Sequence, residues 1–238
     1  MRTESQPRAA AISLDLSGET TAGRKALTAS VDHLIIAGWT GRDPAAMEAH
    51  MAELEKIGIA RPKIAPIFYR VAATLLTTAP DIQVLGTDSS GEVEPVLMSL
   101  ADGLWLGVGS DHTDRKVETI GISISKQLCP KPISTHLWRF DELRTHWDDL
   151  VVRCFAIKDG QRRLYQEGTL AKMRHPEDLM TRHFGKNTMP AGTAMFCGTL
   201  AVHGKIEPAD AYELEIEDPV LNRRIVHHYA VRTLPVEG

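Results

Sequence analysis

The sequence is poor in cysteine and has no excess of positive charge. Its three cysteines, Cys129, Cys154 and Cys197, are widely spaced and form no Cys-x-x-Cys pair. This spacing argues against both a disulfide framework and a structural zinc site. The 238 residues carry a net charge of −4, so the chain offers no basic field for nucleic acid, and no nucleic-acid partner is expected.

Long apolar runs are missing as well. No stretch approaches the ~18 consecutive apolar residues that a membrane span requires. The polar segment from Met1 to Pro7 is not followed by the apolar core of a signal peptide. We therefore expect a cytoplasmic protein with no membrane partner. Phosphate-binding glycine loops and Ser-His-Asp signatures are also absent, which argues against a P-loop nucleotide-binding enzyme and against a serine hydrolase.

The chain instead contains many short apolar segments separated by Pro, Gly and Asp, and few helical patterns. Its length suits one large domain. The candidate strands are 32–38, 67–69, 82–85, 92–97, 105–108, 150–157, 193–200, 212–217 and 224–231. Helices are expected from Asp43-Pro44 to Gly58, over 141–147 and over 176–184. This pattern predicts a mostly β, α+β fold of the sandwich or roll type with a few short helices.

A pair of carboxylates in Gly91-Glu92-Val93-Glu94-Pro95 is the first candidate site. If 92–97 is a strand, Glu92 and Glu94 are two residues apart and point to the same face. Two like charges held this close raise each other's pKa unless a cation lies between them. Asp111, which follows the apolar run 103–109, can add a third carboxylate. Oxygen ligands of this kind suit Mg2+, Mn2+ or Ca2+.

An ordinary structural explanation exists for the same residues. Alternating Glu-Val-Glu is also typical of the solvent-facing side of an edge strand. Asp111 or Thr113 can equally cap a helical turn that begins near Asp114. From spacing alone, both the metal site and this explanation stand.

Further motifs follow the carboxylates in a specific order. They are Arg115, Ser125-Lys126-Gln127-Leu128-Cys129-Pro130-Lys131-Pro132, Asp159-Gly160-Gln161, Gln166-Glu167-Gly168-Thr169, Met189-Pro190-Ala191-Gly192-Thr193 and Cys197-Gly198-Thr199. This order resembles the fumarylacetoacetate hydrolase (FAH) superfamily over residues 91–204, and weakly over 34–70. The superfamily pattern has Glu-x-Glu, an Asp and Arg motif, a Lys before a Cys-Pro-x-Pro turn, a hairpin with a following Gln, and Thr-Gly-Thr.

The resemblance implies a role for each matching residue. Glu92, Glu94 and Asp111 correspond to the carboxylates that bind Mg2+, Mn2+ or Ca2+. Lys126 corresponds to the active-site lysine, and Arg115 to the arginine that closes its motif. The substrate-facing positions correspond to Gln166, Gly198 and Thr199. A 2-oxo acid or acylpyruvate can chelate such a metal, which then acts as a Lewis acid that stabilises an enolate, while Lys126 and Arg115 hold negative charge.

Departures from the superfamily pattern concern the general base. The superfamily has Gly-x-Asn-Tyr-x-x-His-x-x-Glu after its first strand, and its His and Glu activate water. Here Pro44 stands where that His is expected. Glu48 and His50 are the nearest replacements, although both also suit a solvated helix. Glu118 stands where a Gln often follows Arg115, which adds negative charge near the site.

These observations lead to three hypotheses. The first is a metal-dependent catabolic hydrolase that cleaves a C–C bond in an acylpyruvate, another 1,3-dicarbonyl or a related 2-oxo acid. The second keeps the metal and the enolate but makes the enzyme a tautomerase, isomerase, decarboxylase or dehydratase. The third is a non-catalytic small-molecule-binding protein. The resemblance also implies a homodimer, and a FAH-like β roll over residues 61–238 that shares one domain with a strand and helix region at 1–60.

Overall fold

Two large β-sheets dominate the computed structural model, which describes residues 11–56 and 61–237. The larger sheet has eight strands, in the order β2 (Gly23–Val31), β1 (Ile12–Thr20), β12 (His136–Arg139), β9 (Gly103–Ser110), β8 (Val93–Leu100), β15 (Thr193–Phe196), β3 (His33–Gly38) and β4 (Ile67–Val71). The smaller sheet has the order β14 (Gln161–Thr169), β13 (Val151–Lys158), β16 (Ala211–Asp218), β17 (Arg223–Leu234) and β6 (Asp81–Leu85). The predicted mostly β, α+β fold is confirmed.

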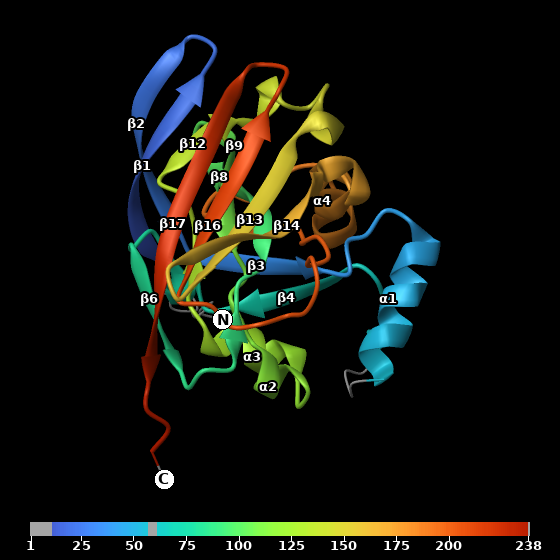
Figure 1. Cartoon of the computed structure of the whole chain (residues 1–238). Coiled ribbons are helices and arrows are strands. Elements are labelled where there is room, and N and C mark those ends of the chain that lie inside the picture. The colour runs from blue at the N-terminus through green and yellow to red at the C-terminus, as the bar shows by residue number, and fades with distance from the viewer. Residues whose placement is uncertain (1–10, 57–60, 238) are drawn as a thin grey trace, which may run out of the picture.

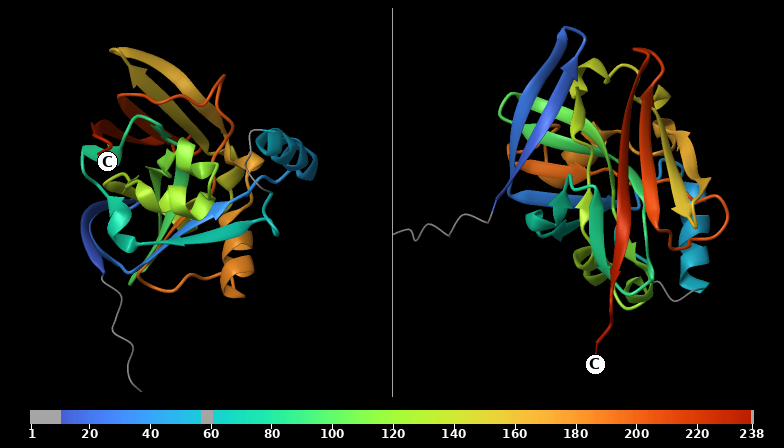
Figure 2. Two further views of the ribbon diagram at one scale, coloured as in Figure 1. Left: turned by 90° about the horizontal axis from the view of Figure 1, so that it is seen from below. Right: turned by 60° about the vertical axis from the view of Figure 1, so that its left-hand side comes forward.

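Short elements complete the fold between and beside the sheets. Two small ladders pair β7 (Ser89–Ser90) with β10 (Thr113–Asp114), and β5 (Leu76–Thr77) with β11 (Lys131–Pro132). The α-helices are α1 (Pro44–Lys56), α2 (Arg115–Glu118), α3 (Ile122–Leu128) and α4 (Pro176–Phe184), and the 3-10 turns are Ala73–Leu75, Phe140–Glu142, Trp147–Asp149 and Leu170–Lys172. Helix α1 lies at the periphery, whereas α2 and α3 lie together beyond one end of the smaller sheet (Figures 1 and 2). Among residues 11–56 and 61–237, none of the helices combines the length and the apolar character that a membrane-spanning helix needs.

The two sheets face each other (Figures 1 and 2). Both faces of the larger sheet are buried around its central strands β8, β15 and β3. Strand β3 illustrates this arrangement: Ile35 and Ala37 pack into the core between the sheets, whereas Leu34 and Ile36 pack into a second core on the opposite face. Strand β8 is buried along its whole length because it lies between β9 and β15 and has one core packed on each of its faces. The centre of the larger sheet is therefore shielded from water on both sides.

Two sequence predictions about helices and strands need correction. The apolar residues Phe140, Leu143 and Trp147 have helical spacing and are all buried, but two 3-10 turns bury them in place of the expected helix over 141–147. The strand expected over 193–200 ends at Phe196, because Gly198 has a φ of 104° that a strand does not allow. The helix expected from residue 176 to 184 is confirmed as α4, and α1 is confirmed over its described part.

Candidate metal centre

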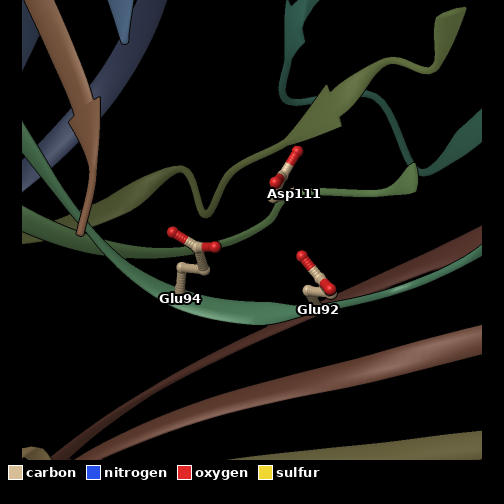
Figure 3. A group of neighbouring side chains, drawn as sticks. All are labelled: Glu92, Glu94 and Asp111. Carbon is tan, nitrogen blue, oxygen red and sulfur yellow. The ribbon is translucent and has the colours of Figure 1, made fainter. Parts of the chain in front are cut away.

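Three carboxylates meet at the junction of β8 and β9 (Figure 3). Glu92 and Glu94 flank the first residue of β8, and Asp111 directly follows the last residue of β9. The two strands are antiparallel, with Glu94 opposite Gly109, and the Asp111 N–H donates to the Glu92 carbonyl oxygen at 3.0 Å. One ligand oxygen from each carboxylate lies within 4.8 Å of the others. The predicted three-carboxylate face is therefore present, and we call these residues the triad.

The ordinary structural explanation of the triad does not hold. Strand β8 is internal, and Glu94 is 2% exposed, so Glu94 is not on the solvent side of an edge strand. The helical turn after β10 is capped by Asp114, whose side chain accepts from the Val117 N–H. Asp111 is completely buried and is not this cap.

Two glycines allow the backbone to approach the triad closely. A Cβ on Gly109 would lie 2.7 Å from the Pro132 carbonyl oxygen. Gly198 donates its N–H to Glu94 Oε2 at 2.7 Å, and a Cβ there would lie 1.7 Å from Thr40 Oγ1. Both contacts are too short for any side chain larger than hydrogen. The Cys197-Gly198-Thr199 motif therefore fixes Glu94, as well as the loop after β3.

Two lysines supply positive charge to Asp111. Lys126, on α3, contacts Asp111 Oδ2 and lies 3.7 Å from Glu92 Oε2. Lys131, on β11, lies 3.0 Å from Asp111 Oδ1. Burial alone would raise the pKa of Asp111, but the two ammonium groups outweigh it and lower that pKa to about 2. Asp111 is thus held as a carboxylate without access to water.

Arg115 closes the other side of the triad. Its Nη1 lies 2.9 Å from Glu92 Oε1 and 3.0 Å from Glu118 Oε2, and its Nε donates to Ser90 Oγ at 2.7 Å. Burial would lower its pKa, but Glu92 and Glu118 outweigh this effect and raise it. Arg115 therefore shares its charge between two carboxylates, one of which is the Glu118 that the sequence marks as unusual.

Glu94 differs from the other two carboxylates because no cation in the described residues forms a salt bridge with it. Burial raises its pKa well above the ordinary value, and the charges of Asp111 and Glu92 raise it further. Its Oε2 accepts only a backbone N–H. Asp111 Oδ1 also accepts no well-aligned hydrogen bond. Three converging hard oxygen donors, with one carboxylate left uncompensated, fit a divalent cation such as Mg2+ or Mn2+.

Gln166 and Thr199 lie beside the triad, but their polar atoms already have protein partners. The Gln166 amide accepts from the Val93 N–H at 3.0 Å and donates to Thr199 Oγ1 at 2.8 Å and to the Leu200 carbonyl oxygen at 2.5 Å. Thr199 in turn donates to the Val93 carbonyl oxygen at 2.8 Å. Gln166 is completely buried. These contacts fix the start of β8, and the roles of both residues in substrate binding stay predictions.

The two residues proposed as a general base are both on α1. Glu48 is exposed, and its carboxylate lies 2.5 Å from Arg61 Nη1, so its described contact is with that arginine and not with the triad. The side chain of His50 lies outside the described residues. Their catalytic role stays a prediction, and no contact among the described residues supports it.

Sequence reasoning missed a buried polar network behind the triad. Tyr229 donates from its hydroxyl to Ser110 Oγ at 2.9 Å and lies 3.0 Å from His112 Nδ1. Ser110 Oγ accepts from the Glu92 N–H at 3.1 Å, and His112 Nε2 lies 2.9 Å from Ser89 Oγ. Strand β17 is thereby tied to the triad from more than 100 residues away in sequence. Only the position of Ser110 and His112 on either side of Asp111 signalled this network.

The cysteines near these motifs are poor nucleophiles. Cys129 is 2% exposed and Cys197 is 1% exposed. Burial raises the pKa of Cys129 to about 11 and raises that of Cys197 as well. Neither residue supplies a thiolate near neutral pH.

Comparisons with known proteins agree with this fold. A family model described as "Protein of unknown function (DUF2848)" matches residues 37–229. No curated protein matches the chain significantly. Among solved structures, yeast ynq8, a fumarylacetoacetate hydrolase family protein, is 18% identical with a TM-score of 0.61 and alignment over 87% of this chain and 95% of that one.

Two further solved structures have the same fold. A 2-keto-3-deoxy-D-arabinonate dehydratase complexed with magnesium and 2,5-dioxopentanoate is 16% identical, with a TM-score of 0.59 over 87% of this chain and 74% of that one. Cg1458 with inhibitor is 16% identical, with a TM-score of 0.63 over 86% and 78%. At these identities the likeness concerns the fold, and it confirms the FAH-like architecture that the motif order predicted.

Proposed function

Because this chain belongs to the family of proteins of unknown function DUF2848 and has the fold of the FAH superfamily, we propose that it is a divalent-metal-dependent enzyme. Its proposed substrate is a small 2-oxo acid or 1,3-dicarbonyl compound, and its proposed reaction proceeds through an enolate. The similar dehydratase structure with magnesium and 2,5-dioxopentanoate supports this substrate class. The observation that carries the proposal is the triad, in which Glu94 and Asp111 are buried and Glu92 is partly buried, with Lys126 beside it.

The triad is proposed to bind the metal ion, and Lys126 is proposed to bind an anionic group of the substrate. Glu92, Glu94 and Asp111 would hold the metal ion, with Mg2+ as the first candidate and Mn2+ or Ca2+ as others. A bound divalent cation supplies Lewis-acid stabilisation of negative charge on the oxygens of an enolate. The Lys126 ammonium, 3.7 Å from Glu92, offers a second positive group for a carboxylate or an oxyanion. Burial would lower its pKa, but Asp111 and Glu92 outweigh burial and raise it, so it stays charged.

Other residues of the site position these groups. Gly198 holds Glu94 through its N–H, and Gln166 and Thr199 fix the backbone of Val93 from both sides. Burial excludes bulk water, which strengthens the electrostatic attraction between the site and an anionic substrate. Arg115 is engaged by Glu92 and Glu118, so its proposed role is to orient Glu92 as much as to hold substrate charge.

C–C hydrolysis is the first specific reaction that we propose, because the enolate produced by cleavage is the species that such a site stabilises. Hydrolysis also requires a base that activates water, and Glu48 contacts Arg61 in place of the triad. This observation, together with Pro44 at the position of the usual His, favours a second candidate that needs no such base. Dehydration, decarboxylation or tautomerisation of a 2-oxo acid meets that condition.

A turnover assay on purified protein tests the proposal. The panel contains acylpyruvates, fumarylacetoacetate, oxaloacetate and 2-keto-3-deoxy sugar acids, each with Mg2+ or Mn2+ and again with chelator. For the hydrolase, we expect chelator-sensitive formation of two acids. For the second candidate, we expect chelator-sensitive release of water or CO2 from the substrate, or a chelator-sensitive fall in enol absorbance without C–C hydrolysis. The test variant is Glu94→Gln, which removes one proposed metal ligand and should abolish turnover. Absence of metal binding and of turnover by the wild type would leave a non-catalytic binding protein and would refute the proposal.

The organisation of the protein around this site is also proposed. Strands from 12–38 pair with strands from later in the chain, as β3 with β15 shows, which supports a single domain that includes the N-terminal region. We propose that the protein works as a cytoplasmic homodimer. Light scattering after size exclusion should then give twice the mass of one chain, and a monomer mass would contradict this assembly.

A further inference from the structure

Lys131 is a buried charge to which the sequence assigned no role. It follows Cys129-Pro130 on β11, and its side chain is completely buried. Only one other lysine among the described side chains, Lys126, is buried. An ammonium group removed from water costs several kcal/mol unless it is well paired, so its partners indicate what it does.

Both partners of Lys131 belong to the segment that supplies the third carboxylate. Its Nζ donates to the His112 carbonyl oxygen at 2.6 Å and lies 3.0 Å from Asp111 Oδ1. The other carboxylate oxygen of Asp111 contacts Lys126. Asp111 is thus held between two ammonium groups, one of which is fixed to the backbone next to it. Lys126 retains slight exposure at 6%, whereas Lys131 has none.

The charges around the triad have a definite balance. When every ionisable side chain of this group is charged, four carboxylates and three cations leave a net charge of −1. The carboxylates are Glu92, Glu94, Asp111 and Glu118, and the cations are Arg115, Lys126 and Lys131. A divalent cation would change this charge to +1. Without Lys131 the group would carry −2, and the same cation would neutralise it. Lys131 therefore opposes the binding of a free divalent cation and leaves one positive charge for an anionic ligand.

We propose that Lys131 is a positioning residue that serves as an internal counter-cation of the triad. It holds Asp111 in place in the metal-free protein, weakens the binding of a free divalent cation, and makes tight metal retention depend on a monoanionic substrate such as a 2-oxo acid. This inference rests on the proposed metal-dependent function and deepens it. By reciprocity, the factor by which substrate strengthens metal binding equals the factor by which metal strengthens substrate binding.

Mn2+ titration of the metal-free protein tests this role, with Lys131→Met and Lys131→Gln compared with the wild type. Glutamine retains a donor for the His112 carbonyl oxygen but lacks the charge, so it separates the electrostatic effect from the hydrogen bond. The matched control is Lys158→Met, which removes the same charge from an exposed lysine at the end of β13. Each titration is repeated with saturating pyruvate, the simplest monoanionic 2-oxo acid.

Both Lys131 variants should bind Mn2+ alone about tenfold more tightly than the wild type, which corresponds to ~1.4 kcal/mol. Their metal-free forms should melt at a lower temperature than the metal-free wild type, because Asp111 loses a partner. Mn2+ should raise the melting temperature of each variant by more than it raises that of the wild type. Pyruvate should strengthen Mn2+ binding by the wild type more than by either variant. Lys158→Met should behave as the wild type does.

The possible failures are distinguishable. Absence of saturable Mn2+ binding by the wild type both without and with pyruvate would refute the proposed function itself. Wild-type binding with equal or weaker binding by folded Lys131 variants would refute only the role of Lys131, as would equal strengthening by pyruvate in all proteins. A variant that is unfolded alone but folds with Mn2+ would support the role, whereas a variant that Mn2+ does not rescue would overturn it.

Discussion

Replacing Glu94 by glutamine should have opposite effects on stability and on metal binding. One ligand oxygen from each of Glu94, Glu92 and Asp111 lies within 4.8 Å of the other two. Two like charges at that distance repel by ~3.5 kcal/mol at the effective dielectric constant of ~20 that suits protein sites. Lys126 offsets part of this repulsion. An amide of the same shape removes the repulsion, and its oxygen can still accept the Gly198 N–H.

We therefore expect Glu94→Gln to raise the free energy of unfolding of the metal-free protein by about 1–2 kcal/mol, which is typical of a single stabilising substitution. For a chain of this size the melting temperature should rise by ~2–8 °C. The variant also loses one of three charged ligands, so its affinity for Mn2+ should fall at least ~10-fold, the lower limit for removing even an indirect partner of a metal.

Calorimetry measures both quantities on the same samples, by thermal unfolding without metal and by Mn2+ titration. The matched control is Glu207→Gln, which removes the same charge from a carboxylate that is 45% exposed and paired with Arg163; it should change neither quantity appreciably. A Glu94→Gln protein that is less stable without metal, or that binds Mn2+ as the wild type does, would refute the reasoning that Glu94 is an uncompensated ligand.

Three other perturbations have definite expected results. Tyr229→Phe removes the hydroxyl at the centre of the buried network, so chemical denaturation should show a loss of about 1–3 kcal/mol; an unchanged midpoint would count against the network. Gly198→Ala introduces a Cβ 1.7 Å from Thr40 Oγ1 at a positive φ, and should lower the melting temperature by several degrees as well as weaken Mn2+ binding. Burial, aided by the neighbouring His228, lowers the pKa of His227 to about 4 in the folded protein. Because the unfolded chain binds this proton from about pH 6.5 downwards, the free energy of unfolding is unaffected above pH ~6.5 and falls by up to about 3 kcal/mol as the pH falls towards 4. His227→Leu should reduce that pH dependence in denaturation curves, and an unaltered slope between pH 6.5 and 4 would contradict the assignment.

Local sequence patterns were sufficient to predict the strands at the centre of the molecule, whereas the triad was predicted only when the order of the motifs was added to the spacing of Glu92 and Glu94. Glu92 and Glu94 flank Val93, the first residue of β8, and the two-residue period of a strand predicts that both carboxylates point to one face. Asp111 was recognisable as a third carboxylate because it follows the apolar run 103–109. The fold class followed from the density of short apolar segments, and the motif order identified the superfamily architecture that the similar structures confirm.

Contacts between distant segments were not accessible in the same way. Helix α3 begins with Ile-Ser-Ile-Ser, which has the alternation of a strand, although Ile122–Leu128 forms a helix that carries Lys126 to the triad. The partnership of Tyr229 with Ser110 depends on how the smaller sheet packs on the larger one. Lys131 looked like a turn residue because nothing in Cys-Pro-Lys-Pro signals complete burial. The catalytic roles of Glu48 and His50, and the division of the chain at residue 60, stay predictions.

Anomalous diffraction from crystals of the protein grown with Mn2+ tests the central claim most directly. Data collected at the manganese absorption edge should contain one strong peak per chain, within bonding distance of carboxylate oxygens from Glu92, Glu94 and Asp111. Crystals of Glu94→Gln grown in the same way should lack this peak. A wild-type map with no peak at the triad, or with its only strong peak at surface carboxylates, would contradict the account.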